Sequence, residues 1–237
     1  MSYIVSWYWD RGSFREKNED SFSLQHVRAG GEELALLLVC DGIGGLPEGE
    51  CASGLAAELL TEWFYREGIR RMTGPFWRRR TVRAAKGALE EVQEKLERCE
   101  REEEICSGTT CTMALVRGNR FVLLHLGDSR AYRIGARQRQ LTDDHQEGGV
   151  LRRCLGAFGM DEPDVVFGRL RKGELLLLCT DGFCRRAPEA YFAGCLAGER
   201  EKRTLYRRLK GTGSFLEAQG EKDNMTAVLL RCEGGKA

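Results

Sequence analysis

The chain of 237 residues contains 42% hydrophobic and 31% charged residues and has a formal net charge of +1. This composition is that of an ordinary globular protein, and the near-neutral charge argues against nucleic acid or an anionic membrane as its main partner. No apolar run reaches membrane-spanning length and the N-terminus does not resemble a signal peptide, so we expect a cytoplasmic protein with free thiols.

Short apolar runs separated by turn residues predict most of the secondary structure. The first two runs flank the turn-like Ala29-Gly30-Gly31. Runs so close together can be joined only by hairpins, so we expect mainly antiparallel sheets. The expected strands cover residues 21–27, 33–40, 109–116, 120–127, 130–134, 162–170, 174–180 and 225–232.

Three helical regions interrupt the strands. The first should open at Pro47, the second should cover residues 81–100, and a third should cover roughly 188–209. We interpret the basic runs Arg78–Arg80 and Arg207–Arg208 as solvated helix faces. With no linker or repeat in the chain, we expect residues 1–237 to form a single α+β domain. The apolar stripes of the first two helices are Leu55, Leu59 and Trp63, then Val82, Ala85, Leu89, Val92 and Leu96.

Acidic residues recur at the ends of the expected strands. One such acid alone would be an ordinary turn residue, but the repetition favours a common site. The acids are Glu19, Asp20, Asp41, Asp128, Asp181 and Asp223.

Carboxylates gathered at one sheet edge would repel one another unless cations bridged them. Oxygen ligands without histidine or cysteine suit Mg²⁺ or Mn²⁺, and two such ions about 3.5–4 Å apart can direct a hydroxide at phosphorus. The glycines after Asp41 would let the backbone approach the ions. Neither G-x-x-x-x-G-K-[ST] nor G-x-G-x-x-G is present there, which argues against a nucleotide loop. Arg15, close to Glu19, could bind a phosphate.

The ordered motifs "REKNED", "VCDGIGG", "CSGTTCTMALV", "HLGDSRAYRI", "LTDDH", "LCTDGF" and "DNMT" resemble those of the metal-dependent type 2C serine/threonine protein phosphatases. The resemblance implies a four-layer α-β-β-α sandwich of two mainly antiparallel sheets flanked by helices. It also implies hydrolysis of phosphoserine and phosphothreonine by metal-bound hydroxide, without a phosphoenzyme. The expected partners are a phosphoprotein substrate and a cognate serine/threonine kinase.

The resemblance also implies roles for single residues. Asp41 should bridge two core Mn²⁺ or Mg²⁺ ions and Gly42 should offer its carbonyl to one of them, with Asp181 and Asp223 completing the coordination shell of the second ion. One of Glu19 and Asp20 should contact a metal directly or through water. Asp128 should bind a third, weaker ion and Arg15 the substrate phosphate. The remaining expectations are structural roles for Ser107, Thr109 and Thr110, and space for phosphate at Gly44 and Gly45.

Two departures from the family pattern concern the mechanism. Ile43 stands where many eukaryotic members have a histidine proposed as general acid, so the leaving-group proton must come from metal-bound water or matter less. The interval between His145 and Asp181 is short, which we interpret as a reduced flap beside the active site.

Two other readings of the sequence compete with this one. The segments Cys111–Arg117 and Cys179–Arg185 fit the C-x₅-R pattern of cysteine-dependent phosphatases. The first alternates like a strand, and in the second an acid beside the thiol would blunt its reactivity. The other alternative is a catalytically weak or inactive phosphatase-fold binding module, which the retention of all six acids disfavours.

Overall fold

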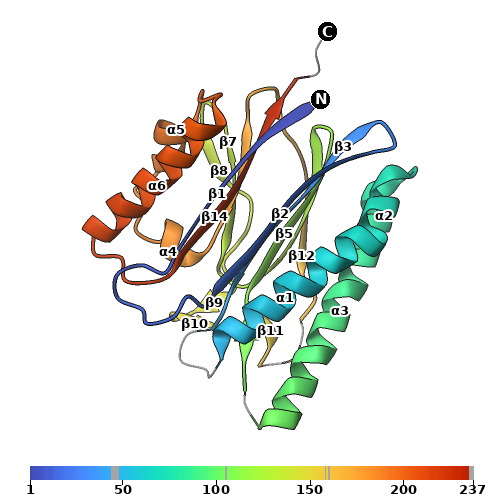
Figure 1. The fold of residues 1–237 in the computed structure, drawn as a ribbon, viewed down its shortest axis with the longest axis vertical. Coiled ribbons are helices and arrows are strands. Elements are labelled where there is room, and N and C mark those ends of the chain that lie inside the picture. Colours follow the sequence, from blue (N-terminus) through green and yellow to red (C-terminus); the bar gives the residue numbers. More distant parts are fainter. Residues whose placement is uncertain (44–47, 105, 158, 160, 235–237) are drawn as a thin grey trace.

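The computed structural model describes residues 1–43, 48–104, 106–157, 159 and 161–234, and places two antiparallel sheets face to face between helices (Figure 1). This confirms the expected four-layer α+β sandwich. The first five-stranded sheet has the order β1 (Ser2–Asp10), β14 (Met225–Glu233), β13 (Leu175–Cys179), β7 (Arg130–Ile134) and β8 (Gln138–Gln140). The second has the order β12 (Asp164–Arg169), β6 (Arg120–Leu126), β5 (Cys111–Arg117), β3 (Glu32–Asp41) and β2 (Asp20–Ala29).

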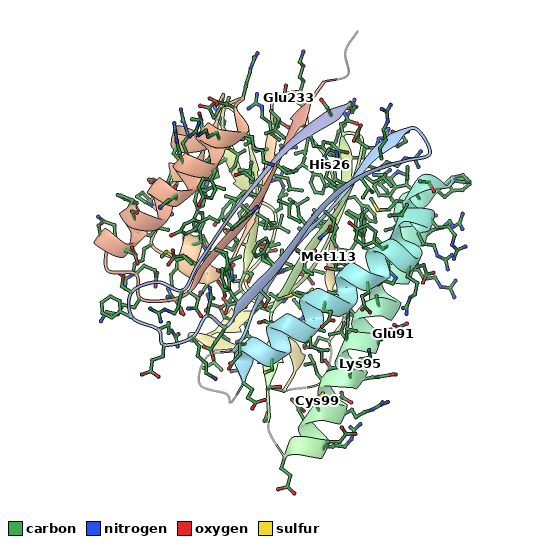
Figure 2. All side chains as sticks on the ribbon, in the orientation of Figure 1. His26, Glu91, Lys95, Cys99, Met113 and Glu233 are labelled. Carbon is green, nitrogen blue, oxygen red and sulfur yellow. The ribbon has the colours of Figure 1, made fainter. Side chains whose placement is uncertain are left out.

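The central strands are buried on both faces, which explains their nearly continuous apolar sequence. In β3, Leu36 and Leu38 face the helices, whereas Leu37 and Val39 face the other sheet. This is the two-residue alternation of a strand. Met113 of β5 lies in the layer between its sheet and α1 (Figure 2).

Helices cover the outer face of each sheet. Next to the second sheet lie α1 (Gly49–Trp63), the π-helical turn η1 (Phe64–Gly68), α2 (Ile69–Thr73) and α3 (Trp77–Glu103). Next to the first lie α4 (Asp181–Cys184), α5 (Tyr191–Leu196) and α6 (Lys202–Ala218). Two short pairs complete the fold: β9 (Gln146–Glu147) with β10 (Val150–Leu151), and β4 (Gly108–Thr109) with β11 (Leu155–Gly156).

Several boundaries differ from the sequence expectation. The second helix begins at Trp77 rather than at residue 81, and the third expected region is two helices separated at Ala197, which is extended, and Gly198, which has positive φ. Strand β1 was not predicted. Pro47 lies outside the described residues. None of the described helices combines the length and hydrophobicity needed to cross a bilayer.

Candidate metal centre

A cavity of about 170 Å³ lies among strand ends contributed by both sheets. Asp41 ends β3, Asp128 follows β6, and Asp181 follows β13. The antiparallel strands therefore bring acids from distant segments of the chain to the same cavity. The cavity is lined by Arg15, Glu19, Asp41, Gly42, Ile43, Thr110, Asp128, Leu151, Asp181, Asp223 and Asn224.

The main chain at Asp41 is held by the neighbouring threonines. Thr110 N and Thr109 Oγ1 both donate to Asp41 O, at 2.9 and 3.0 Å, and Asp41 N donates to Thr110 Oγ1 at 2.9 Å. Burial raises the pKa of Asp41 well above its usual range, and Asp20 and Asp181 raise it further. The threonines thus fix a carboxylate whose charge needs a cation close by.

Gly42 occupies a position where a side chain cannot fit. Its N–H donates to Glu19 O at 3.0 Å. A Cβ on Gly42 would stand 2.4 Å from Gly49 O and 2.7 Å from Glu19 O, both backbone atoms that cannot rotate away. Glycine here is required by the close approach of three chain segments. Gly44 and Gly45 lie outside the described residues.

Asp20 lies beneath the cavity and does not line it. It pairs with Asp41 across β2 and β3. Its Oδ2 accepts hydrogen bonds from Thr180 Oγ1 at 2.9 Å and Thr226 Oγ1 at 2.6 Å. Thr226 belongs to β14 of the other sheet, and Thr180 directly follows β13 of that sheet. Asp20 Oδ1 is buried without a partner among the described residues. Burial raises the pKa of Asp20 to about 7.

Asn224 clamps the loop that carries Arg15 and Glu19, a role that sequence reasoning missed. Its Oδ1 accepts from Glu19 N at 2.8 Å, and its Nδ2 donates to Arg11 O at 2.8 Å and Lys17 O at 3.0 Å. The side chain therefore satisfies three backbone groups of one loop. The only signal in the sequence was the Asn itself in the motif "DNMT".

Arginines pair with the acids on one side of the cavity. Arg15 reaches Asp223 at 2.8 Å, and Arg185, which sequence reasoning also missed, reaches Asp181 at 2.6 Å and Asp223 at 3.6 Å. Arg185 also pairs at 2.8 Å with the buried Glu221. Burial raises the pKa of Asp181 to about 6. With these pairs in place, no group of three or more described His, Cys, Asp or Glu side chains is arranged to hold a metal ion.

Asp128 lies on a tight turn that His145 holds. Gly127 has φ +118, and a Cβ there would stand 2.5 Å from Thr110 Cβ. His145 N donates to Gly127 O at 2.8 Å and Gly127 N donates to His145 Nδ1 at 3.1 Å. Burial raises the pKa of Asp128. From the region expected to form a reduced flap, the β9–β10 hairpin contributes Leu151 to the cavity.

The chemistry of this donor set fits hard divalent cations. The titratable groups lining the cavity, apart from Arg15, are carboxylates, without histidine or cysteine. Burial raises the pKa of four of them, Glu19, Asp41, Asp128 and Asp181, and neighbouring acids raise each of these pKa values further. The buried Asp20 Oδ1 is a further acceptor for which the described residues supply no donor.

The cysteine alternatives do not form a reactive centre. Cys111 and Arg117 stand at opposite ends of β5, which separates them by about 20 Å. Cys179 is fully buried, and burial raises its pKa well above the usual value for a thiol. Cys111 and Cys179 are both free thiols. A thiolate nucleophile is therefore disfavoured at both segments.

Known proteins resemble the chain over most of its length. The sequence model of the family described as Protein phosphatase 2C matches residues 14–229. The serine/threonine phosphatase stp of Listeria innocua is 28% identical over 93% of this chain and 92% of its own length. PstP of Mycobacterium tuberculosis, a serine/threonine protein phosphatase, is 29% identical over 93% of this chain and 43% of its own. The crystal structure of an arginine-to-lysine variant of a bacterial serine phosphatase superposes with a TM-score of 0.86 at 25% identity, covering all of both chains.

Proposed function

The chain belongs to the protein phosphatase 2C family, and from this premise we propose that residues 1–237 form one catalytic domain that hydrolyses phosphoserine and phosphothreonine by direct attack of water on phosphorus. The chain is a serine/threonine protein phosphatase of a metal-dependent family. The observation that carries the proposal is the convergence of five strand-end carboxylates and Arg15 on one cavity.

Two core ions, Mn²⁺ or Mg²⁺, fit the carboxylates of this cavity. Asp41 would hold both ions, and the Gly42 carbonyl, Asp181 and Asp223 would be further ligands. One of Glu19 and Asp20 would contact a metal directly or through water, and Asp128 would hold a third, weaker ion. When bound, the ions supply positive charge for the phosphoryl oxygens and lower the pKa of a water molecule.

The chain's own residues bind and orient the substrate. Arg15 is half exposed at the cavity and can offer two parallel N–H donors to a phosphate. It now pairs with Asp223, so a phosphate would compete for a guanidinium already directed at the site. Asn224 holds the loop on which Arg15 lies. Ile43 and Leu151 give the cavity two apolar walls, neither of which donates a proton.

Phosphoproteins are the substrates that a protein phosphatase requires, and we propose that a serine/threonine kinase adds the phosphate which this enzyme removes. The similarity to the phosphatases stp and PstP supports this pairing only at the level of substrate class. The site itself recognises the phosphoryl group, which is common to every such substrate.

The test is a hydrolysis assay with Mn²⁺ or with EDTA on phosphothreonine and phosphotyrosine peptides. We expect Mn²⁺-dependent release of phosphate, faster from phosphothreonine, and none with EDTA. Asp41→Asn and Asp181→Asn should each lower the rate at least about a hundredfold, because each removes charge from the ion site. Full activity in both variants would refute the ligand assignment, and activity resistant to EDTA would refute the metal dependence.

A further inference from the structure

The first half of α3 contains only positive charge. Its cations are Arg78, Arg79, Arg80, Arg83 and Lys86, and the first acid of the helix is Glu90. Further along, charges are mixed and some are paired; Glu91, for example, pairs with Arg66, and Lys95 lies one turn further on (Figure 2). The charge is therefore segregated along one helix and is not a uniformly solvated face.

This distribution opposes the electrostatics of the helix. The N-terminus of a helix carries partial positive charge, so acids there stabilise it and cations destabilise it. The first turn of α3 contains no acid, and the acids concentrate toward its C-terminus. Stability of the isolated fold therefore does not account for the arginines.

A second unfavourable placement adjoins the first. Arg120 of β6 and Arg169 of β12 are directly opposite each other in the sheet. Like charges in this position destabilise a strand pair. Alternation along each strand puts both on the α3 side, because Val122 and Val165, two and four residues away, pack in the core beneath the helices. We call Arg78, Arg79, Arg80, Arg83, Arg120 and Arg169 the basic surface. None of these six arginines forms an ion pair with an acid whose side chain the structure describes.

A groove of about 570 Å³ runs between α3 and β12 beside these residues. Arg79 and Arg83 line it, one helical turn apart, opposite Phe167 of β12, which is 49% exposed. Lys86, which pairs with Glu162, and Glu90 line it further along α3. The Arg78 guanidinium lies over the Phe167 ring, 5.6 Å from its centroid. Strand β12 is at the edge of its sheet, and no further strand in the described part of the chain pairs with it.

We propose that the groove between α3 and β12 binds an extended, acidic segment of a partner protein, with the basic surface pairing its carboxylates. Charge complementarity identifies the acidic character of the partner, since none of the six arginines pairs with an acidic side chain in the described part of the chain. The open edge of β12 identifies a polypeptide, since only another chain can use its free N–H and C=O groups by adding a strand. Exposed Phe167 adds an apolar contact for alternate side chains.

The groove lies at the end of the sheet away from the catalytic cavity. Strand β6 runs from Arg120 to Leu126, just before Asp128, a length of about 20 Å. A protein with an acidic segment some ten residues from its phosphoserine could therefore occupy both places and gain effective concentration at the cavity. This last step alone rests on the proposed function, because binding in the groove requires no hydrolysis.

The first experiment measures binding by fluorescence anisotropy, with the full chain and a labelled peptide of alternating glutamate and threonine. We expect saturable binding that weakens as salt is added. Arg79→Glu combined with Arg83→Glu should weaken it about tenfold or more, because two attractions become repulsions. The matched control reverses Arg203 and Arg207 on α6, an equally spaced exposed pair on the opposite side of the sandwich, and should leave affinity within about twofold. Equal loss in both variants would show attraction to net charge alone and would overturn the site.

Further probes test the class of partner and the use of the strand edge. The same peptide with alternate backbone nitrogens methylated should bind at least about tenfold more weakly, because it cannot add to β12. If single-stranded oligothymidylate or phosphatidylserine vesicles bound more tightly than the acidic peptide, and the α3 double variant weakened that binding as well, the proposal of a protein partner would be refuted. Because both arginine pairs are exposed, circular dichroism should give the same unfolding temperature for both double variants within a few degrees.

A phosphoserine peptide with and without an acidic extension separates this inference from catalysis. In the wild type the extension should lower KM about tenfold, and the α3 double variant should lose this effect while keeping its kcat on the short peptide. Binding of the acidic peptide without any hydrolysis would support the groove and reject the proposed function. Hydrolysis without any groove-dependent binding would support the proposed function and reject the groove as a binding site.

Discussion

Replacing Asn224 by alanine should release the loop that carries Arg15 and Glu19. The Asn224 side chain is 4% exposed and makes three hydrogen bonds to backbone atoms of Arg11, Lys17 and Glu19. Each such bond contributes about 1 kcal/mol net. Their loss should shift the balance between the closed and open loop by about 3 kcal/mol, or roughly a hundredfold, since 1.4 kcal/mol is tenfold.

Hydrogen exchange measures this shift directly, because the Glu19 amide donates to Asn224 Oδ1. Its protection factor should fall by about a hundredfold in Asn224→Ala, and kcat/KM should fall with it because Arg15 is held less firmly. Asn18→Ala is a graded control in the same loop. It removes one hydrogen bond, from Asp20 N at 3.1 Å, together with a buried Nδ2 that has no partner among the residues with described positions, so its effect should stay below about tenfold. Unchanged protection at Glu19 in Asn224→Ala would refute the clamp.

Three other predictions concern the same cavity. Gly42→Ala should lower the free energy of unfolding in urea by about 2 kcal/mol or more, because the new Cβ would meet two backbone oxygens at 2.4 and 2.7 Å. The control Gly54→Ala in α1 should leave this free energy unchanged or raise it, because its Cβ would meet only Ser21 Oγ, at 3.9 Å. Arg15→Ala should raise KM about tenfold with a smaller effect on kcat, and Arg11→Ala on the same loop should change neither; equal kinetics for the two would remove Arg15 from the substrate site. In EDTA, the melting temperature should fall as pH rises from about 5 to 8. The folded-state pKa values of Asp20 and Asp181, about 7 and about 6, lie above those of unfolded carboxyls, so the folded protein binds more protons and loses this advantage as they ionise. Mn²⁺ should flatten the profile, and a melting temperature that rises over this range would contradict the raised pKa values.

The basic runs show where sequence reasoning stopped short. Arg78–Arg80 read as a solvated helix face, because a charge run on a helix usually is one. Only the folded chain places Arg120 and Arg169 on the same side and opens a groove against β12. The distinction depends on residues some forty to ninety positions apart, which no local pattern relates.

Local rules determined the parts of this protein that short stretches of chain can specify. Short apolar runs such as "ELALLLVC" and the close turns between them predicted antiparallel strands, since runs so near in sequence can be joined only by hairpins. The acids at Asp41, Asp128 and Asp181 could be recognised because each ends such a run. The helix boundaries were less certain, and the break at Ala197–Gly198 was missed because the surrounding composition remains helical.

Tertiary structure decided which of these residues act together and in what capacity. Glu19 and Asp20 are adjacent in sequence, yet Glu19 lines the cavity whereas Asp20 lies beneath it. Asp20 is held there by Thr226 of the other sheet and by Thr180, which follows a strand of that sheet. Asn224 meets Glu19 across 205 positions of sequence. Such contacts form only when the two sheets pack face to face, so their energy belongs to the packed sandwich and has no trace in either segment alone.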